Sequence, residues 1–204
     1  DEAALFGEEF VEHDLRYEMA EVFPSRLAQL WSSNENLTDD GPYWSMEDAF
    51  VTPKPRFGRP IMVNASGSAA GIRYGVRHSD IMFITSPAGN QLEDAVVSVP
   101  GHVAAIRTAA AAEGRQVRTI INPMILCRDT EREAIAYRDA IEAAADTEAV
   151  EGFAEHGRRG DAQAWRNQRR LHRAIGGNLH LVGSPQQIVE GFLKLRDAGV
   201  DGVQ

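Results

Sequence analysis

The sequence predicts an α/β fold with a parallel sheet covered by helices on both faces. Three short and continuously apolar runs, at 60–65, 80–84 and 117–127, alternate with helical segments, and a fourth begins at Val200. Strands that are apolar throughout are buried on both faces, as in parallel sheets. Four strands with four or more helices fit half of an eight-stranded barrel or an open doubly wound sheet, and periodicity does not choose between them.

The helices between the strands are predicted from apolar periodicity and from their end signals. Pro24 should kink or divide the first helix, and Pro100 is a point at which the third could break. Ser184, Pro185 and Gln187 supply an N-cap, a first-turn proline and the third residue of a capping box, so they open the last helix. The predicted helices are 11–31, 69–78, 92–113, 130–145 and one that starts at 184. Residues 33–60 contain several prolines and predict a long loop.

Composition excludes several classes of function. The net charge of −9 argues against nucleic-acid binding, because phosphate backbones need a basic surface. The single cysteine, Cys127, allows no disulfide within the chain. No apolar run of about 18 residues or signal-peptide pattern is evident, so neither a membrane span nor export is expected, and the predicted location is the cytoplasm. The sequence lacks an initiator Met and ends in an apolar run, so we expect a piece of a longer protein.

Two places have residues suited to holding a phosphate. At 64–71 a strand leads through small residues into a helix, where Ser68 can add a hydroxyl to the N–H groups of the helix start. An ordinary Ser-capped turn has the same pattern. Arg16 and Tyr17 can hold a phosphate through charge and a phenol hydrogen bond, or they can be a surface arginine and a half-buried tyrosine. The six histidines have no zinc-ligand spacing, so no metal site is predicted, and no hydrolase or P-loop motif occurs.

Several segments, taken in order, resemble the luciferase-like flavin-dependent monooxygenases, and the nearest group is the pyrimidine monooxygenases, which open the uracil ring. The segments that carry the resemblance are 1–7, 16–17, 60–71, 79–83, 181–187 and 197–202. The resemblance implies that the α/β fold is the C-terminal half of a (β/α)8 TIM barrel of the bacterial luciferase type, truncated at both ends. The chain would then begin after the fourth strand of the barrel and stop in the eighth.

The resemblance also implies the position of a flavin site. Glu2 matches an acidic position near the flavin, Arg16 and Tyr17 match a pair that approaches the FMN phosphate, and Ser68 matches a serine that contacts the same phosphate. The family usually has Gly at the position of Ser66. Catalytic residues are not assigned, because the groups nearest the reactive edge of the flavin are expected in the absent first half.

The function implied by this resemblance is that of the oxygenase of a two-component system. A separate NAD(P)H:flavin reductase would supply reduced FMN, and O2 would add to it to give a flavin peroxide or hydroperoxide. One oxygen atom would then enter a small organic substrate, such as a pyrimidine or other N-heterocycle, with an organosulfur compound as a further class. Dimers are usual among relatives, so a homo-oligomer, a dimer or a tetramer, is expected.

The resemblance further implies one partial barrel domain over 1–204, with a lid insertion at 151–178. Arginines in that insertion, including Arg166 and Arg169, would close over a phosphate or an anionic substrate, or else belong to a solvated amphipathic helix. Two other functions fit the same barrel. One is a deazaflavin (F420)-dependent oxidoreductase that transfers hydride without oxygen, and the other is a non-catalytic flavin-binding subunit.

Overall fold

The computed structural model describes residues 2–159 and 171–204, and for residues 2–3 and 156–159 it describes the backbone alone. The chain divides into two compact units, which we call the first unit (1–62) and the second unit (63–204). The expectation of one partial barrel domain over the whole chain stays a prediction.

The first unit consists of two helices and a hairpin. Helix α2 continues through Pro24 without a break, and the side chain of Glu12 caps it by accepting from two backbone N–H groups. Trp44 packs against Phe23 of α2 with ring centroids 6.0 Å apart, and Arg26 of α2 pairs with Asp39 at 2.5 Å. These contacts stabilise the packing of the hairpin against α2. The elements are α1 (Glu2–Leu5), α2 (His13–Ser32), β1 (Leu37–Asp40) and β2 (Ser45–Ala49).

The hairpin corrects the prediction of a continuous loop at 33–60. Strands β1 and β2 pair antiparallel, and their sequences, LTDD and SMEDA, are too polar for the apolar alternation that predicts a strand. Side chains stabilise the pairing, because Thr38 accepts a hydrogen bond from the Asp48 N–H at 3.0 Å and Asn36 donates to the Asp48 carboxylate at 2.6 Å. The prediction was therefore wrong for this segment.

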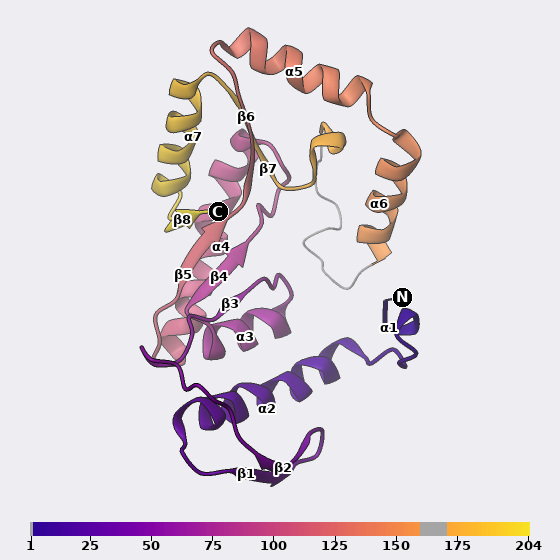
Figure 1. Ribbon diagram of the computed structural model, residues 1–204. Coiled ribbons are helices and arrows are strands. Elements are labelled where there is room, and N and C mark those ends of the chain that lie inside the picture. The colour runs from indigo at the N-terminus through magenta and orange to yellow at the C-terminus, as the bar shows by residue number, and fades with distance from the viewer. Residues whose placement is uncertain (1, 160–170) are drawn as a thin grey trace. The chain divides into compact units, whose positions relative to one another are not determined.

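All strands of the second unit are parallel (Figure 1). Four of them form one sheet in the order β3-β4-β5-β8, and β6 pairs with β7 in a separate two-stranded sheet. The parallel α/β arrangement predicted from the apolar runs is confirmed. The strands are β3 (Val63–Asn64), β4 (Ile81–Ile84), β5 (Arg118–Ile121), β6 (Pro123–Cys127), β7 (Leu179–Gly183) and β8 (Gly202–Val203).

Three details of the strand prediction are wrong. The run 117–127 is two strands, because the chain passes from the β4 sheet to the β7 sheet at Asn122. Strand β7 was not predicted as a strand at all. The strand predicted over 60–65 is short and not buried, since Ile61 is 72% exposed and Val63 53% exposed. Among the described residues β3 pairs with β4 alone, so its other edge has no neighbouring strand.

The predicted helices 69–78, 92–113, 130–145 and the one that starts at 184 match the structure within a few residues, whereas the helix over Thr147–Arg159 was not predicted. Ser68, Thr130 and Ser184 are N-caps whose side chains each accept from a backbone N–H in the first turn, and the last two complete capping boxes. Helix α4 is not broken at Pro100. The elements are α3 (Ala69–His78), α4 (Leu92–Ala112), α5 (Glu131–Ala143), α6 (Thr147–Arg159), the 3₁₀ turn η2 (Arg173–Ile175) and α7 (Pro185–Asp197).

Helix α4 lies at the centre of the hydrophobic core of the second unit. It contacts α3, α7 and β7, and its residues at spacings of three and four are buried. By length and composition alone α4 is also apolar enough to cross a membrane, which the sequence had not led us to expect. Its packing accounts for part of that composition, because 28% of the apolar window is buried and each buried Val or Ile stabilises the fold by about 1.5–3 kcal/mol. The buried residues of α4 are Ala95, Val99, Val103, Ile106 and Ala110.

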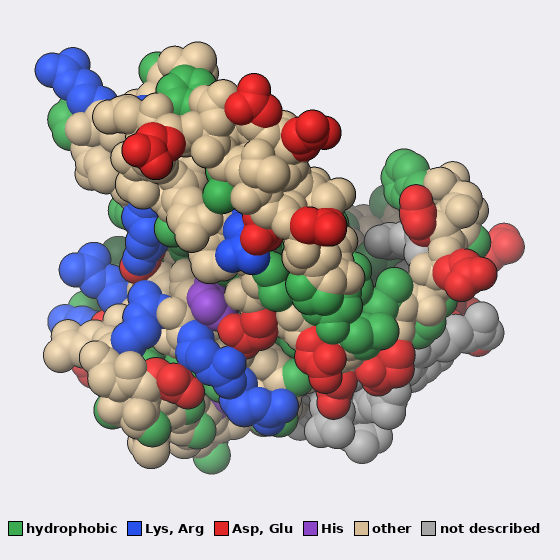
Figure 2. Space-filling view, turned by 90° about the horizontal axis from the view of Figure 1, so that it is seen from below, with side chains coloured by type: hydrophobic (Ala, Val, Ile, Leu, Met, Phe, Trp, Pro, Cys, Tyr) green, Lys and Arg blue, Asp and Glu red, His purple; other side chains and the backbone are tan. Residues whose placement is uncertain are grey.

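Large hydrophobic side chains also lie on the surface. Figure 2 shows hydrophobic side chains on one face together with both acidic and basic ones. Phe57 is 93% exposed, Phe6 83%, Leu5 81% and Val97 80%. Single exposed apolar residues are ordinary in soluble proteins.

Candidate functional site

The turn between β3 and α3 has the features of an anion-binding helix start. Ser68 is the N-cap of α3, and its Oγ accepts a hydrogen bond from the Gly71 N–H at 3.1 Å. Because Oγ acts as the acceptor there, its own hydrogen remains available to donate. The N–H groups of Ala69 and Ala70 lie in the first turn, where no helical carbonyl can accept from them. The turn can therefore offer several donors to one oxyanion.

Ser66 is held within the same turn. Its hydroxyl donates to Oδ1 of Asn64 at the end of β3, over 2.5 Å. This bond ties the turn to the strand that precedes it. The side chain of Ser66 is thus used for the local structure, and Ser68 is the residue of the two that caps the helix.

Close packing fixes the position of α3 on the sheet. A Cβ atom at Gly75 would lie 2.4 Å from Sδ of Met82 and 2.6 Å from its Cε. Met82 belongs to β4 and is fully buried, so the end of its side chain would have to shift within the core. Glycine at position 75 therefore allows α3 to lie this close to β4 without displacing Met82.

Arg16 and Tyr17 lie in the first turns of α2, in the first unit. The guanidinium of Arg16 lies over the ring of Phe10, 5.4 Å from its centroid, and the side chain is exposed. Tyr17 is half-buried and makes an edge contact with His13 at 5.1 Å between centroids. Neighbouring residues on a helix point in different directions, so the two side chains do not face one another.

Two expected site features lie outside the described residues. Glu2 is the first residue of α1, but its side chain is not described. The centre of the expected lid, with Arg166 and Arg169, falls in 160–170, which is likewise outside the description. Of the remaining site residues, Arg16 and Tyr17 belong to the first unit and Ser68 to the second. Their meeting at one phosphate stays a prediction.

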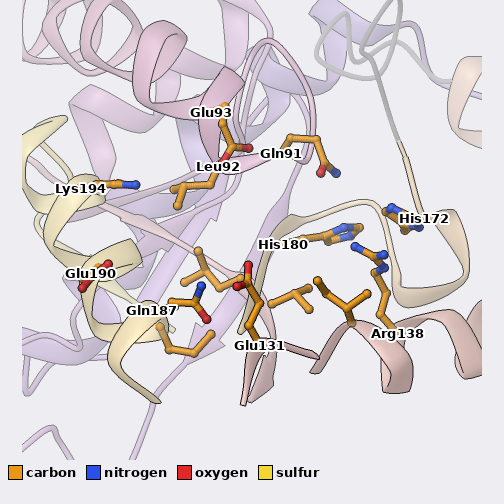
Figure 3. A pocket seen from close by; sticks show the side chains of 14 residues that line it. Gln91, Leu92, Glu93, Glu131, Arg138, His172, His180, Gln187, Glu190 and Lys194 are labelled. Atoms are coloured by element: carbon orange, nitrogen blue, oxygen red, sulfur yellow. The ribbon is translucent and has the colours of Figure 1, made fainter. Parts of the chain in front are cut away.

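The second unit also contains a cleft that the sequence did not predict (Figure 3). Its volume is about 300 Å³, and α4, α5, β7 and α7 all contribute to its walls. Figure 3 shows the side chains of His172, His180 and Arg138 at one end of this cleft and those of Lys194, Glu190 and Glu93 at the other. No local motif marks these residues, because they come from segments far apart in the sequence.

His180 is a buried polar side chain of the cleft. It is 6% exposed, and its Nε2 lies 2.9 Å from the carbonyl oxygen of Gly176. A carbonyl can only accept, so this contact, which is shorter than the 3.3 Å between Nε2 and Nδ2 of Asn90, favours the ring hydrogen on Nε2 and a lone pair on Nδ1. Nδ1 is buried and has no hydrogen-bond partner among the described residues.

The surroundings of His180 favour its neutral form. Burial lowers the pKa of His180 below its ordinary value, and the hydrogen bond to Gly176 opposes that effect. The positive charges of His172 and Arg138 lower the pKa further, whereas Glu142 raises it. The imidazole is therefore a neutral acceptor at Nδ1, placed next to groups that repel its protonated form.

The parallel strands joined by helices define an α/β protein of the barrel type. Its Ser-capped helix start after β3 is suited to holding a phosphate. The chain belongs to the luciferase-like monooxygenase family, whose model matches residues 1–202. The family expected from the sequence is confirmed.

Relatives in the family include two kinds of flavin enzyme. The chain is 31% identical to the FMNH(2)-dependent dimethylsulfone monooxygenase of Pseudomonas fluorescens, over 98% of this chain and 55% of the relative. It is 30% identical to the pyrimidine monooxygenase RutA of Pantoea ananatis, over 66% of this chain and 36% of the relative. Among solved structures, riboflavin lyase (RcaE) has a TM-score of 0.79 at 19% identity, over 98% of this chain and 55% of that one. At 19% identity, the likeness to riboflavin lyase shows a shared fold and no more.

The chain spans about half the length of the curated relatives that match nearly all of it, at 55% and 56%. The residues of this chain therefore form only some of the strands and helices of the barrel fold.

Proposed function

We propose that this chain forms part of an FMNH2- and O2-dependent monooxygenase that acts on a small organic molecule and receives reduced FMN from a separate reductase. The observation that carries the proposal is the match to the dimethylsulfone monooxygenases, which extends over 98% of the chain. Reduced FMN would supply the electrons with which O2 is activated, and the protein would bind and orient it and exclude water.

The Ser68 turn supports the binding of FMN through its phosphate. The hydroxyl of Ser68 and the first N–H groups of α3 are donors of the kind that hold phosphates at helix starts. Arg16 and Tyr17 would add a charge and a phenol donor. Glu2 would lie near the flavin, and no residue of this chain is assigned as a catalytic acid or base.

The substrate we propose is a small N-heterocycle, such as a pyrimidine, or an organosulfur compound. Both classes occur in the names of the relatives, and the dimethylsulfone enzymes match more of this chain than RutA does. Uracil and dimethylsulfone are therefore the first two substrates to compare. Oxygen consumption with reduced FMN separates this proposal from an F420-dependent oxidoreductase, which would consume none, and FMN binding without turnover would indicate a non-catalytic subunit.

Replacing Ser68 by Ala tests the phosphate site. The S68A variant should bind FMN about tenfold more weakly, because one donor to a charged group is lost. Its affinity for riboflavin, which has no phosphate, should not change. Affinities for both flavins are measured by fluorescence quenching.

Ser184→Ala is the matched control, because Ser184 caps α7 in the same way as Ser68 caps α3. S184A should lose a similar cap energy but keep its preference for FMN over riboflavin. An equal loss of FMN affinity in both variants, or a loss in S68A that is the same for FMN and riboflavin, would contradict a phosphate contact at Ser68.

A further inference from the structure

The cleft beside His180 has features that the flavin proposal does not use. His172, one of its lining residues, has a positive φ of 51°, a conformation that non-glycine residues rarely adopt. Such strain is stored where the surrounding structure imposes it, and it gathers at functional sites. Asn90, which is fully buried, binds both backbone groups of Leu171, next to His172.

Asn90 also connects the two histidines. Its backbone carbonyl accepts from the N–H of His180 at 2.8 Å, and its side-chain amide binds Leu171 at 2.7 and 3.1 Å. One buried residue therefore sets the positions of both His172 and His180 at this end of the cleft. Such pre-organisation is what a binding site needs and what a merely solvated groove lacks.

The same end of the cleft has positive charge and an unfilled hydrogen-bond position. Arg138 uses Nε and Nη2 to bind the Asp139 carboxylate at 3.0 and 2.8 Å, which leaves Nη1 for another acceptor. Figure 3 shows its guanidinium next to the ring of His180. Nδ1 of that ring is the buried atom without a partner among the described residues. A buried polar atom of this kind is rare and calls for a ligand or a water.

We propose that this cleft binds a small organic carboxylate, whose oxygens are held by Arg138, His172 and His180, and that His180 takes up a proton at Nδ1 when the carboxylate binds. A lone pair on Nδ1 would repel a carboxylate oxygen, whereas an N–H would donate to it. The negative charge of the ligand offsets the charges of Arg138 and His172, which disfavour the protonated ring of the empty cleft.

The remaining walls supply a few apolar side chains and more acidic than basic groups, which favours a ligand with no more than one negative charge. Leu181, Val182 and Ile188 supply apolar surface. Carboxylates on the lining helices would repel a ligand with two or more charges, such as phosphate. The charged or titratable groups that face the cleft or act on His180 are Glu93 from α4, Glu131, Arg138 and Glu142 from α5, Glu190 and Lys194 from α7, and His172.

The test compares benzoate with benzamide, which has the same shape but no charge. Binding to the full chain is followed by calorimetry and by NMR of the histidine rings at about pH 6 and about pH 8. Benzoate should bind about tenfold more tightly at the lower pH, with net proton uptake and a shift of the His180 ring signals. Benzamide should bind more weakly and without proton uptake.

Two variants locate the site, and a third is their control. Arg138→Gln should weaken benzoate binding by about tenfold. His172→Asn should also weaken it, while Asn tolerates the positive φ at that position. Arg196→Gln should have no effect, although Arg196 binds its neighbour Asp197 over the same distances as Arg138 binds Asp139.

The proposal concerns the second unit alone and does not rest on the flavin chemistry. Benzoate that binds equally well at both pH values would overturn it. So would equal effects of R138Q and R196Q, benzamide binding as tight as that of benzoate, or no benzoate binding at millimolar concentration.

Discussion

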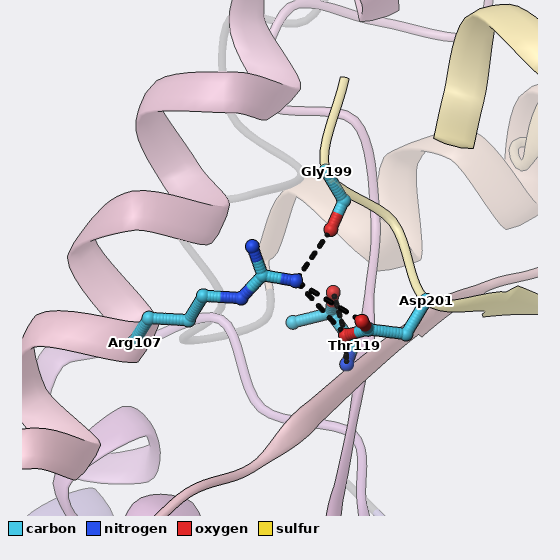
Figure 4. Close-up of polar contacts among 4 residues, drawn as sticks. All are labelled: Arg107, Thr119, Gly199 and Asp201. Atoms are coloured by element: carbon cyan, nitrogen blue, oxygen red, sulfur yellow. Dashed lines mark hydrogen bonds and ion pairs between the residues drawn. The ribbon is translucent and has the colours of Figure 1, made fainter. Parts of the chain in front are cut away.

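At the scale of single residues, Asp201 joins three parts of the second unit through one carboxylate (Figure 4). It accepts from the Thr119 N–H at 2.8 Å and the Thr119 hydroxyl at 3.2 Å, and both its oxygens lie 3.1 Å from Nη2 of Arg107. The same Nη2 donates to the carbonyl of Gly199 at 2.8 Å. Burial alone would raise the pKa of Asp201, but the bonds from Thr119 and Arg107 outweigh it and hold the pKa below its ordinary value.

Replacing Asp201 by Asn should therefore reduce stability in a pH-dependent way. The expected loss is about 1 kcal/mol at neutral pH, less than for a fully buried charged bond because solvent screens the pair. Since the folded pKa is depressed, the stabilisation is complete above the unfolded value of about 3.9 and is lost as pH falls through the folded pKa. Urea unfolding at about pH 7 and about pH 3 should show the difference between D201N and wild type narrowing at low pH.

Asp197→Asn is the control for this change, because Asp197 is a neighbouring aspartate that pairs with Arg196 in a largely exposed position. The D197N change should lower the free energy of unfolding by no more than about 0.5 kcal/mol at either pH. A D201N deficit that stays the same at both pH values would show that the carboxylate charge does not stabilise the fold.

At the scale of the elements, the position of α3 depends on a glycine. Gly75→Ala would press a methyl group into the buried end of Met82, and overpacking of this kind costs about 1–3 kcal/mol. That cost exceeds the gain of up to about 1 kcal/mol in helix propensity. Thermal or urea unfolding of G75A should therefore show a loss of stability.

Gly101→Ala, in helix α4 of the same unit, is the control, and its expected effect on stability is the opposite of that of Gly75→Ala. A Cβ at Gly101 would have nothing within 4 Å, so only the propensity term remains and G101A should be stabilised by about 0.5–1 kcal/mol. Stabilisation of both variants would mean that Met82 can move aside and that α3 is not held by close packing.

Helices were predicted better than strands because their signals are local. The bounds of α3, residues 69–78, and the capping box of α7 follow from residues within a few positions of each helix end. Whether a strand forms depends on its partner, and the partner of β6 is β7, more than 50 residues away in the chain. The polar strands of the hairpin at Leu37–Asp40 and Ser45–Ala49 are stabilised by cross-strand side chains, which no apolar pattern marks.

The two candidate sites also differ in whether a local sequence pattern marks them. Ser68 could be identified from sequence, because a serine after small residues at the end of a strand is a local pattern, and the structure confirms it as the N-cap. The cleft at His180 could not be identified, since Asn90 and Leu171, which shape it, are 81 residues apart. For Arg16 and Tyr17 the residues alone left phosphate binding and a plain surface role open, the resemblance favoured phosphate binding, and it stays a prediction.

At the scale of the whole molecule, the hydrophobic core belongs to the second unit. Each residue of the buried core cluster comes from 76–200, including Val99 and Ile106 of α4. Helix α2 of the first unit has no buried residue, and its Phe23 is 48% exposed. Local stability follows buried apolar contact, so the two helices should differ in their resistance to opening.

Hydrogen exchange measured by mass spectrometry should reveal this difference in the chain. Peptides from α2 should exchange at least about tenfold faster than peptides from α4, after correction for intrinsic rates, because opening α2 exposes little apolar surface. Repeating the measurement over a range of protein concentrations separates two causes of any protection in α2. Protection that rises with concentration would mean that a second copy covers the helix, whereas equal protection of α2 and α4 at every concentration would contradict the assignment of the stable core to the second unit alone.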